Sequence, residues 1–342
     1  MQRLIIVIFV ENLLKYNMTQ SIVKRFKEKV LKGDFLSFEE ILELNNKADF
    51  TELCEAANEI REKFCGNEFD LCTIANAKSG KCTEDCKFCS QSSHYSTGVD
   101  EYDLINEEDA LKLAKENDEN GVNKFSLVTS GRVVNDKMLD NLCNIFSKIK
   151  QQTKLRTCAS MGLINKDQAQ KLVTVGVEHY HCNLETGPNY FEKICTTHSY
   201  KEKLKAIQDA KDAGLEICSG GIIGLGETMI DRIEMAFDLR LLEVKSIPLN
   251  ILNPIEGTPF YGNKSVSRKE VIKTIAIFRF IIPDAKLRFA GGRMHLGDKQ
   301  EDALRAGINA ALTGDYLTTT GFKTKQDIDN FKKMGFQIKP NY

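Results

Sequence analysis

The chain has 342 residues, of which 42% are hydrophobic, and its 47 basic and 48 acidic residues leave a formal net charge of −1. This length and composition predict a chain that folds around a sizeable core of its own. The even mixture of charges excludes the strong basic field of a protein that binds nucleic acid or an acidic membrane surface, so we expect a small-molecule function.

The N-terminal residues and the cysteine usage indicate the compartment. An apolar run at residues 4–10 is too short to span a membrane, and no small-residue cleavage site follows it. We take Met18 as a candidate start and residues 1–17 as an upstream extension. An odd count of eleven irregularly spaced cysteines, without a secretory leader, favours thiols and metal ligands over disulfides. We therefore expect a cytoplasmic protein.

Residues 18–66 have a helical pattern. Ser37 is followed by Glu39 and Glu40, which is typical of a capped helix start. We divide the chain into an N-terminal extension with helices at 1–55, a barrel at 56–320 and a C-terminal helical segment at 321–342.

A short phrase then recurs, in which a glycine can form the left-handed turn that ends a helix and the next residues begin a buried strand. Its copies are NGVNKFSLV from residue 120, VGVEHYHCN from 175, AGLEICSGG from 213 and AGINAALTG from 306. Strand-like runs also occur at 71–76, 154–159, 246–252 and 286–290. Eight strands separated by helices predict an α/β fold, a (β/α)8 TIM-type barrel or a partly open relative of it. A doubly wound sheet is the alternative, which the lack of a GxGxxG motif at the first helix disfavours.

The loop after the first strand reads GKCTEDCKFCSQSS at 80–93, with cysteines at 82, 86 and 89. In a barrel this loop lies at the C-terminal ends of the strands, where active sites of that fold are built. A zinc site would need a fourth ligand, and His94 is the candidate on the same loop. Three cysteines instead suit a 4Fe-4S cluster that leaves one iron open for a substrate or cofactor.

The spacing Cys82-x3-Cys86-x2-Cys89, with Phe88 before the last cysteine, resembles the signature of radical S-adenosylmethionine enzymes. In that superfamily the amino and carboxylate groups of S-adenosylmethionine chelate the open iron, and an electron from the cluster releases a 5′-deoxyadenosyl radical. A barrel suits this chemistry because it shields the radical from water. The resemblance implies that Phe88 lies near the adenine.

Further motifs resemble the biotin synthase family from about residue 55 to the C-terminal helix. They are AKSGKCTEDCKFCSQSSHYSTG, HYHCNLETG, ICTTHSY, ICSGGIIGLGET, IPLNILNPIEGTP and KLRFAGGR. The resemblance implies a sulfurtransferase that inserts sulfur from an auxiliary iron–sulfur cluster into dethiobiotin to form biotin. It also implies a homodimer, the use of two molecules of S-adenosylmethionine, and a flavodoxin or ferredoxin as reductant.

Glycines and polar side chains at the ends of two strands are the candidate nucleoside site. Gly220 and Gly224 let the backbone approach a ligand, and the resemblance implies that this edge receives the adenosyl group with Ile222 against the ring. It further implies that Asn183 and Glu185 contact the ribose, with Asn183 close to the substrate; Glu185 stands where the family more often has Asp.

The resemblance also implies that Asn250 hydrogen-bonds the ureido ring of dethiobiotin. In HYHCNLETG, alternation along the strand puts Asn183 and Glu185 on one inward face. Unpaired polar groups are costly on such a face, so this pattern favours a polar ligand beside them.

An auxiliary 2Fe-2S cluster in this family is held by three cysteines and one arginine. The matching places here are Cys158, Cys218, Arg288 and Ser126, and a serine oxygen binds iron less well than a thiolate. We expect Cys72 to supply the third thiolate, because it stands on the neighbouring strand and can face the same interior layer. Ser126 would then be a weaker ligand or a hydrogen-bond donor. The alternatives that remain are a larger cluster, and Cys72 as a small buried hydrophobe.

Two rival functions remain. Hydrogenase-maturation and methylornithine-forming relatives share the superfamily but lack the full set of Cys158, Cys218 and Arg288. A non-catalytic electron carrier would need the cluster loop alone, and it would leave Asn183 and Asn250 without a role.

Overall fold

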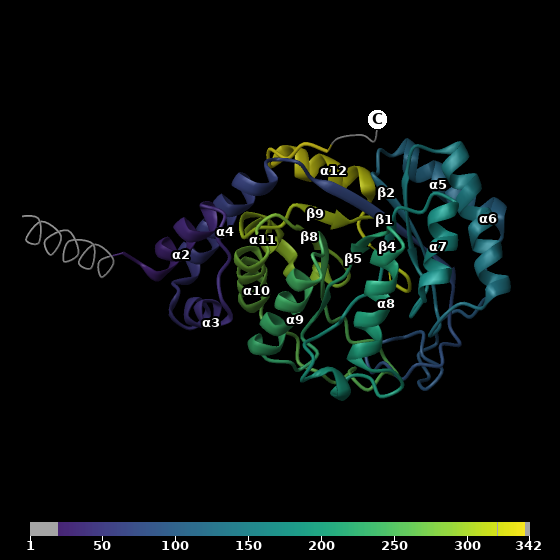
Figure 1. Cartoon of the computed structure of the whole chain (residues 1–342), viewed down its shortest axis with the longest axis horizontal. Coiled ribbons are helices and arrows are strands. Elements are labelled where there is room, and N and C mark those ends of the chain that lie inside the picture. Colours follow the sequence, from purple (N-terminus) through teal and green to yellow (C-terminus); the bar gives the residue numbers. More distant parts are fainter. Residues whose placement is uncertain (1–19, 320, 339–342) are drawn as a thin grey trace, which may run out of the picture.

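The computed structural model describes residues 20–319 and 321–338 (Figure 1). The predictions for residues 1–17 lie outside the described residues. Within these ranges no helix has the length and apolar character needed to cross a bilayer.

One parallel sheet forms the centre of the molecule, in the order β5-β4-β3-β2-β1-β9-β8-β7-β6, and a pairing of β5 with β7 closes it. Residues 219–220 alone separate β5 from β6, so these two strands share one place and the ring is an eight-strand barrel. This confirms the predicted (β/α)8 barrel and excludes the doubly wound sheet. The strands are β1 Asp70–Lys78, β2 Lys124–Thr129, β3 Arg156–Ser160, β4 His179–His181, β5 Glu216–Cys218, β6 Gly221–Ile223, β7 Ser246–Ile251, β8 Lys286–Phe289 and β9 Ala310–Leu312.

Helices surround the barrel (Figure 1). Their bounds are α5 Glu107–Glu119, α6 Asp136–Gln152, α7 Lys166–Thr174, α8 Tyr200–Asp212, α9 Met229–Leu241, α10 Arg268–Ile281, α11 Gln300–Arg305 and α12 Thr324–Lys333, with short 3-10 turns at Phe191–Lys193 and Arg293–Lys299. The glycine of each recurring phrase has a positive φ, as predicted: Gly121 76°, Gly176 87°, Gly214 100° and Gly307 124°. The left-handed turn therefore ends each helix and sends the chain into the next strand.

The N-terminal helices α2 Ile22–Leu31, α3 Phe38–Lys47 and α4 Phe50–Cys65 lie at one side of the barrel, where α4 packs on α10 (Figure 1). Ser37 and Glu40 form a capping box at the start of α3, which confirms the predicted helix start. The domain division at residue 55 falls inside the continuous helix α4, and that division stays a prediction.

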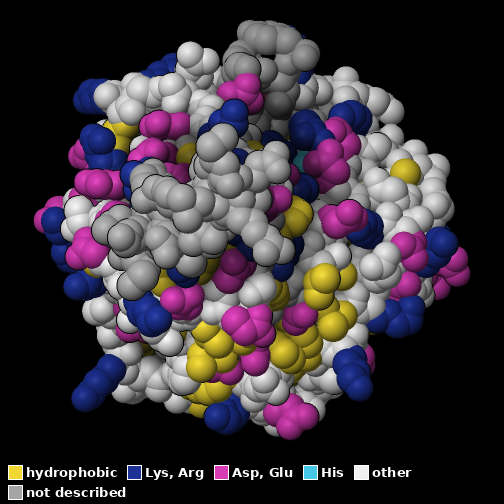
Figure 2. All heavy atoms as spheres, turned by 60° about the vertical axis from the view of Figure 1, so that its left-hand side comes forward, with side chains coloured by type: hydrophobic (Ala, Val, Ile, Leu, Met, Phe, Trp, Pro, Cys, Tyr) yellow, Lys and Arg dark blue, Asp and Glu magenta, His cyan; other side chains and the backbone are white. Residues whose placement is uncertain are grey.

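The two ends of the barrel differ. Helix α12 covers the N-terminal end of β1, where Phe69 and Phe331 stack with ring centroids 4.1 Å apart. The C-terminal ends of the strands carry the cysteine loop. On the face seen in Figure 2, basic and acidic side chains are interspersed around a group of hydrophobic ones, and no single-sign field dominates it.

Candidate active site

A cavity of about 450 Å³ extends from the cysteine loop down into the barrel. Its walls contain every residue that the sequence nominated for the site except Gly220 and Gly224: Cys72, Cys82, Cys86, Phe88, Cys89, Ser126, Cys158, Asn183, Glu185, Cys218, Ile222, Asn250 and Arg288. Residues separated by more than 200 positions therefore line one space, because the barrel brings its inward-facing positions together.

The cysteine loop is held by its own backbone. The Cys82 amide donates to the Gln91 carbonyl at 3.0 Å, and the Cys89 amide donates to the Cys86 carbonyl at 2.9 Å. His94 does not join the thiols, because its Nε2 atom lies 3.0 Å from the Thr83 carbonyl oxygen. His94 therefore does not supply the fourth ligand that a zinc site needs, whereas three cysteines suit a cluster with one free iron.

A second thiol next to this loop was not foreseen in the sequence. Cys195 Sγ lies 3.7 Å from Cys86 Sγ and 3.3 Å from His198 Nδ1. Glu84 contacts the same ring nitrogen and accepts from Thr197 Oγ1 at 2.8 Å. The ligand atoms of Cys86, Cys195 and His198 all lie within 4.8 Å of one another. This group therefore includes Cys86, one cysteine of the motif.

Glu185 is the strained residue of the middle region. Its φ is +71°, which is unusual for a residue with a side chain. Its Oε2 atom is buried without a hydrogen-bond partner, and burial raises the pKa of its carboxyl group. Such an orphaned oxygen at a cavity wall fits a ligand that carries hydroxyl groups.

The two asparagines of this region are already partly engaged. Asn183 Oδ1 accepts from the Gly220 amide at 3.1 Å and lies 2.9 Å from His181 Nε2. Asn250 Nδ2 donates to the Gly221 carbonyl at 3.1 Å, and its Oδ1 accepts from the Gly291 amide at 2.9 Å. These bonds hold both amides in place, and they leave the second Nδ2 hydrogen of Asn250 for a ligand.

The backbone geometry requires glycine at both Gly220 and Gly224. A Cβ at Gly220 would lie 2.0 Å from the Pro248 carbonyl oxygen, and Gly224 has a φ of +103°. The first glycine therefore allows β7 to pack closely and the second makes a turn. The contact of this edge with an adenosyl group stays a prediction.

Deep in the barrel lie Cys72, Cys158 and Cys218. Parallel register pairs Ser126 with Cys158 and His181 with Cys218. Burial raises the pKa of the Cys72 thiol to about 11, and burial followed by the charges of Cys218 and Cys72 raises the pKa of Cys158 well above its ordinary value. All three thiols line the cavity, and cysteine thiolates are the usual ligands of iron–sulfur clusters.

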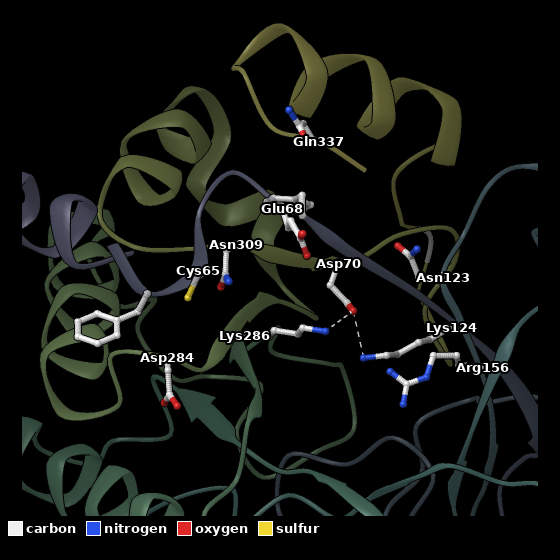
Figure 3. A pocket seen from close by; sticks show the side chains of 12 residues that line it. Cys65, Glu68, Asp70, Asn123, Lys124, Arg156, Asp284, Lys286, Asn309 and Gln337 are labelled. Atoms are coloured by element: carbon white, nitrogen blue, oxygen red, sulfur yellow. Dashed lines mark hydrogen bonds and ion pairs between the residues drawn. The ribbon is translucent and has the colours of Figure 1, made fainter. Parts of the chain in front are cut away.

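Arg288 borders this thiol layer and is anchored by Asp70. It donates from Nη1 to the Ala311 carbonyl at 3.0 Å and from Nη2 to the Asp70 carboxylate. Lys124 and Lys286 also contact Asp70, at 3.1 and 3.0 Å, at the edge of a second cavity of about 350 Å³ (Figure 3). Burial alone would raise the pKa of Asp70, but these three cations outweigh it and hold that pKa well below its usual range.

Comparisons with known proteins identify the family. The Radical SAM superfamily profile matches residues 77–239, and the Biotin and Thiamin Synthesis associated domain matches residues 248–337. The chain is 51% identical over 314 residues to the biotin synthase of Clostridium botulinum strain Hall, covering 92% of this chain and 98% of that protein. With the biotin synthase of Clostridium tetani it shares 47% identity over 322 residues, covering 93% and 99%. The chain belongs to the biotin synthase family.

Solved structures support the fold of this biotin synthase family member. Methylornithine synthase has a TM-score of 0.79 at 19% identity, covering 92% of this chain and 98% of its own. The FeFe-hydrogenase maturase HydG from Carboxydothermus hydrogenoformans has a TM-score of 0.79 at 17% identity, covering 98% and 82%. Identities this low show a shared barrel and no more.

Membership of the biotin synthase family confirms the predicted class of protein. The chain is an enzyme with sulfur-transferase activity that needs an iron–sulfur cluster and S-adenosylmethionine. The electron-carrier alternative is thereby set aside. Asp70 and Cys195 were not singled out in the sequence. For Asp70 there was a signal, because in DLCTIAN this acidic residue stands two places before Cys72 and so faces the same side of the strand.

Proposed function

We propose that the enzyme forms biotin from dethiobiotin in the 450 Å³ cavity, with Cys82, Cys86 and Cys89 as ligands of a 4Fe-4S cluster. One observation carries the proposal. Two sets of three thiols line one cavity, and between them its wall carries the Asn250 amide on β7 and, just after β4, the Asn183 amide and the orphaned Glu185 oxygen.

Each wall residue has a distinct role in this proposal. When bound, the 4Fe-4S cluster with S-adenosylmethionine supplies a radical that removes hydrogen from dethiobiotin, and the auxiliary cluster supplies sulfur. Glu185 Oε2 accepts hydroxyl hydrogen bonds from the ribose beside Asn183. Phe88 and Ile222 pack on the adenine, near Gly220 and Gly224.

The substrate end is formed by uncharged groups. Asn250 donates its second Nδ2 hydrogen to the ureido ring of dethiobiotin. The barrel wall excludes water and fixes the ligand relative to the deep thiols, which is the protein's contribution to cofactor chemistry.

We assign Cys72, Cys158 and Cys218 as thiolate ligands of the auxiliary cluster, 2Fe-2S or larger, with Arg288 on or beside it. Ser126 serves as a weaker ligand or as a donor to Cys158, whose thiol it neighbours. Matched variants test this assignment. Cys72→Ala is expected to lose auxiliary iron and sulfide, and Ser126→Ala to retain most of both. An unchanged auxiliary-cluster signal in Cys72→Ala would reject the role of Cys72.

The family resemblance supports two partner assignments, a flavodoxin or ferredoxin as electron donor and a second copy of the chain in a homodimer. Sedimentation of the anaerobic protein tests the dimer, and turnover with each purified donor tests the reductant.

Turnover tests the function itself. Anaerobically reconstituted protein receives dethiobiotin, S-adenosylmethionine and a reductant, and biotin and 5′-deoxyadenosine are measured by mass spectrometry. We expect both products from the wild type and neither from Cys86→Ala. Cleavage of S-adenosylmethionine without biotin would contradict the proposed substrate, and no cleavage would contradict the cluster.

A further inference from the structure

The imidazole of His179 lines the cavity with one ring nitrogen that has no partner. The residue is 2% exposed, and its Nδ1 atom makes no hydrogen bond. Its Nε2 atom lies 3.1 Å from Glu216 Oε2, which accounts for that nitrogen. Buried polar side chains nearly always have partners, so the Nδ1 atom requires an explanation.

The position of His179 puts this side chain among the deep thiols. Parallel register pairs it with Cys158 on β3. Side chains of paired residues on neighbouring parallel strands point to the same face, with the strands about 4.8 Å apart. Both residues accordingly line the cavity, together with Cys72, Cys218 and Arg288.

The next inward residue of the same strand provides a contrast. His181 also lines the cavity, but its Nδ1 lies 3.3 Å from Ser160 Oγ and its Nε2 lies 2.9 Å from Asn183 Oδ1. Both nitrogens of His181 are thus occupied by protein groups. His179 lies one inward position deeper, at the level of Cys158, and its Nδ1 atom has no protein partner.

We propose that His179 is a ligand of the auxiliary iron–sulfur cluster and binds an iron through a ring nitrogen. This inference rests on the proposed function, which assigns an auxiliary cluster to the deep thiols. Histidine is an established substitute for cysteine on iron, as in the centres where two His replace two Cys on one metal. Here it adds a nitrogen donor to the three thiols assigned above, Cys72, Cys158 and Cys218. A neutral ligand also adds no charge to a layer that already holds Lys124 and Arg288.

Pulsed electron paramagnetic resonance tests this ligand without relying on turnover. The variant Cys82→Ala/Cys86→Ala/Cys89→Ala is reconstituted with iron and sulfide, so that its signal comes from the deep site alone, and it is then cryoreduced. Samples are made with natural histidine and with 15N-histidine. We expect a 14N coupling that becomes a 15N coupling on labelling. Nitrogen from Arg288 stays 14N in both samples, so it does not confuse the comparison.

Two further variants locate the nitrogen. His179→Asn is expected to abolish the labelled coupling completely, and the matched control His94→Asn, at an exposed loop position, is expected to retain it. Iron in the deep site with no change on 15N-histidine labelling would overturn the ligand assignment alone. A triple variant that holds no iron after reconstitution would overturn the auxiliary cluster of the proposed function, and this inference with it. Neither result depends on whether His179→Asn folds, because the labelling comparison keeps His179.

Discussion

Replacing the carboxylate of Asp70 by an amide tests the charge balance beneath the deep thiols. Asp70→Asn keeps the shape of the side chain and removes the charge that faces Arg288, Lys124 and Lys286. The side chains of Arg288 and Lys124 are 4% and 5% exposed, whereas that of Lys286 is 43% exposed. Removing one partner of a buried ion pair costs about 3–5 kcal/mol, because the other charge stays buried and uncompensated. We therefore expect a loss of about 3–5 kcal/mol in the unfolding free energy of the cluster-free protein.

Anaerobic urea unfolding followed by circular dichroism measures this loss. Adding Lys124→Met to Asp70→Asn should recover part of it, because the second change removes a buried charge that has lost its partner. Lys286→Met alone is the matched control for a more exposed partner, with an expected loss of about 0–1 kcal/mol. A loss below about 1 kcal/mol for Asp70→Asn, the size typical of a surface pair, would show that Asp70 does not compensate buried charges.

Three more predictions follow from single contacts. The folded-state pKa of Asp70 is depressed, so the stability that its carboxylate contributes is present above its unfolded pKa of about 3.9. This stability is lost as the pH falls through the lower folded value. The difference in urea midpoint between wild type and Asp70→Asn should therefore shrink below about pH 4 and stay constant at higher pH. Glu185→Gln should weaken S-adenosylmethionine binding by about tenfold or more in anaerobic equilibrium dialysis, because hydrogen bonds to a charged group contribute about 1.5–3 kcal/mol; unchanged affinity would remove Glu185 from the nucleoside site. Gly220→Ala should lower the unfolding free energy by about 1–3 kcal/mol, because the new Cβ would lie 2.0 Å from the Pro248 carbonyl oxygen. In the control Gly262→Ala the new Cβ would have nothing within 4 Å, so urea unfolding should show almost no change.

The barrel could be predicted from local patterns. Glycines such as Gly214 end a helix and open a buried strand, and this signal needs only a few neighbouring residues. The cysteine loop was equally readable, since its three thiols are close in sequence. Closure of the ring was an inference from the number of strands, and the pairing of β5 with β7 confirms it.

Contacts between distant residues could not be read in the same way. Cys195 lies beside Cys86 across 109 positions, and Asp70 contacts Arg288 across 218. Such neighbours depend on strand register and barrel stagger, which short-range periodicity does not determine. Gly220 shows a related limit, because the close approach of the Pro248 carbonyl on the next strand could not be read from the sequence; its predicted contact with a ligand stays a prediction.

A sulfur-tracing experiment tests most directly whether sulfide bound in the protein's own iron–sulfur clusters enters the product. The enzyme is reconstituted with iron and 34S-sulfide, freed of unbound sulfide, and given dethiobiotin, S-adenosylmethionine and a reductant for a single turnover. We expect biotin that carries 34S in proportion to the enrichment of the protein-bound sulfide. Biotin with sulfur of natural isotopic composition, formed by protein that retains its label, would contradict it.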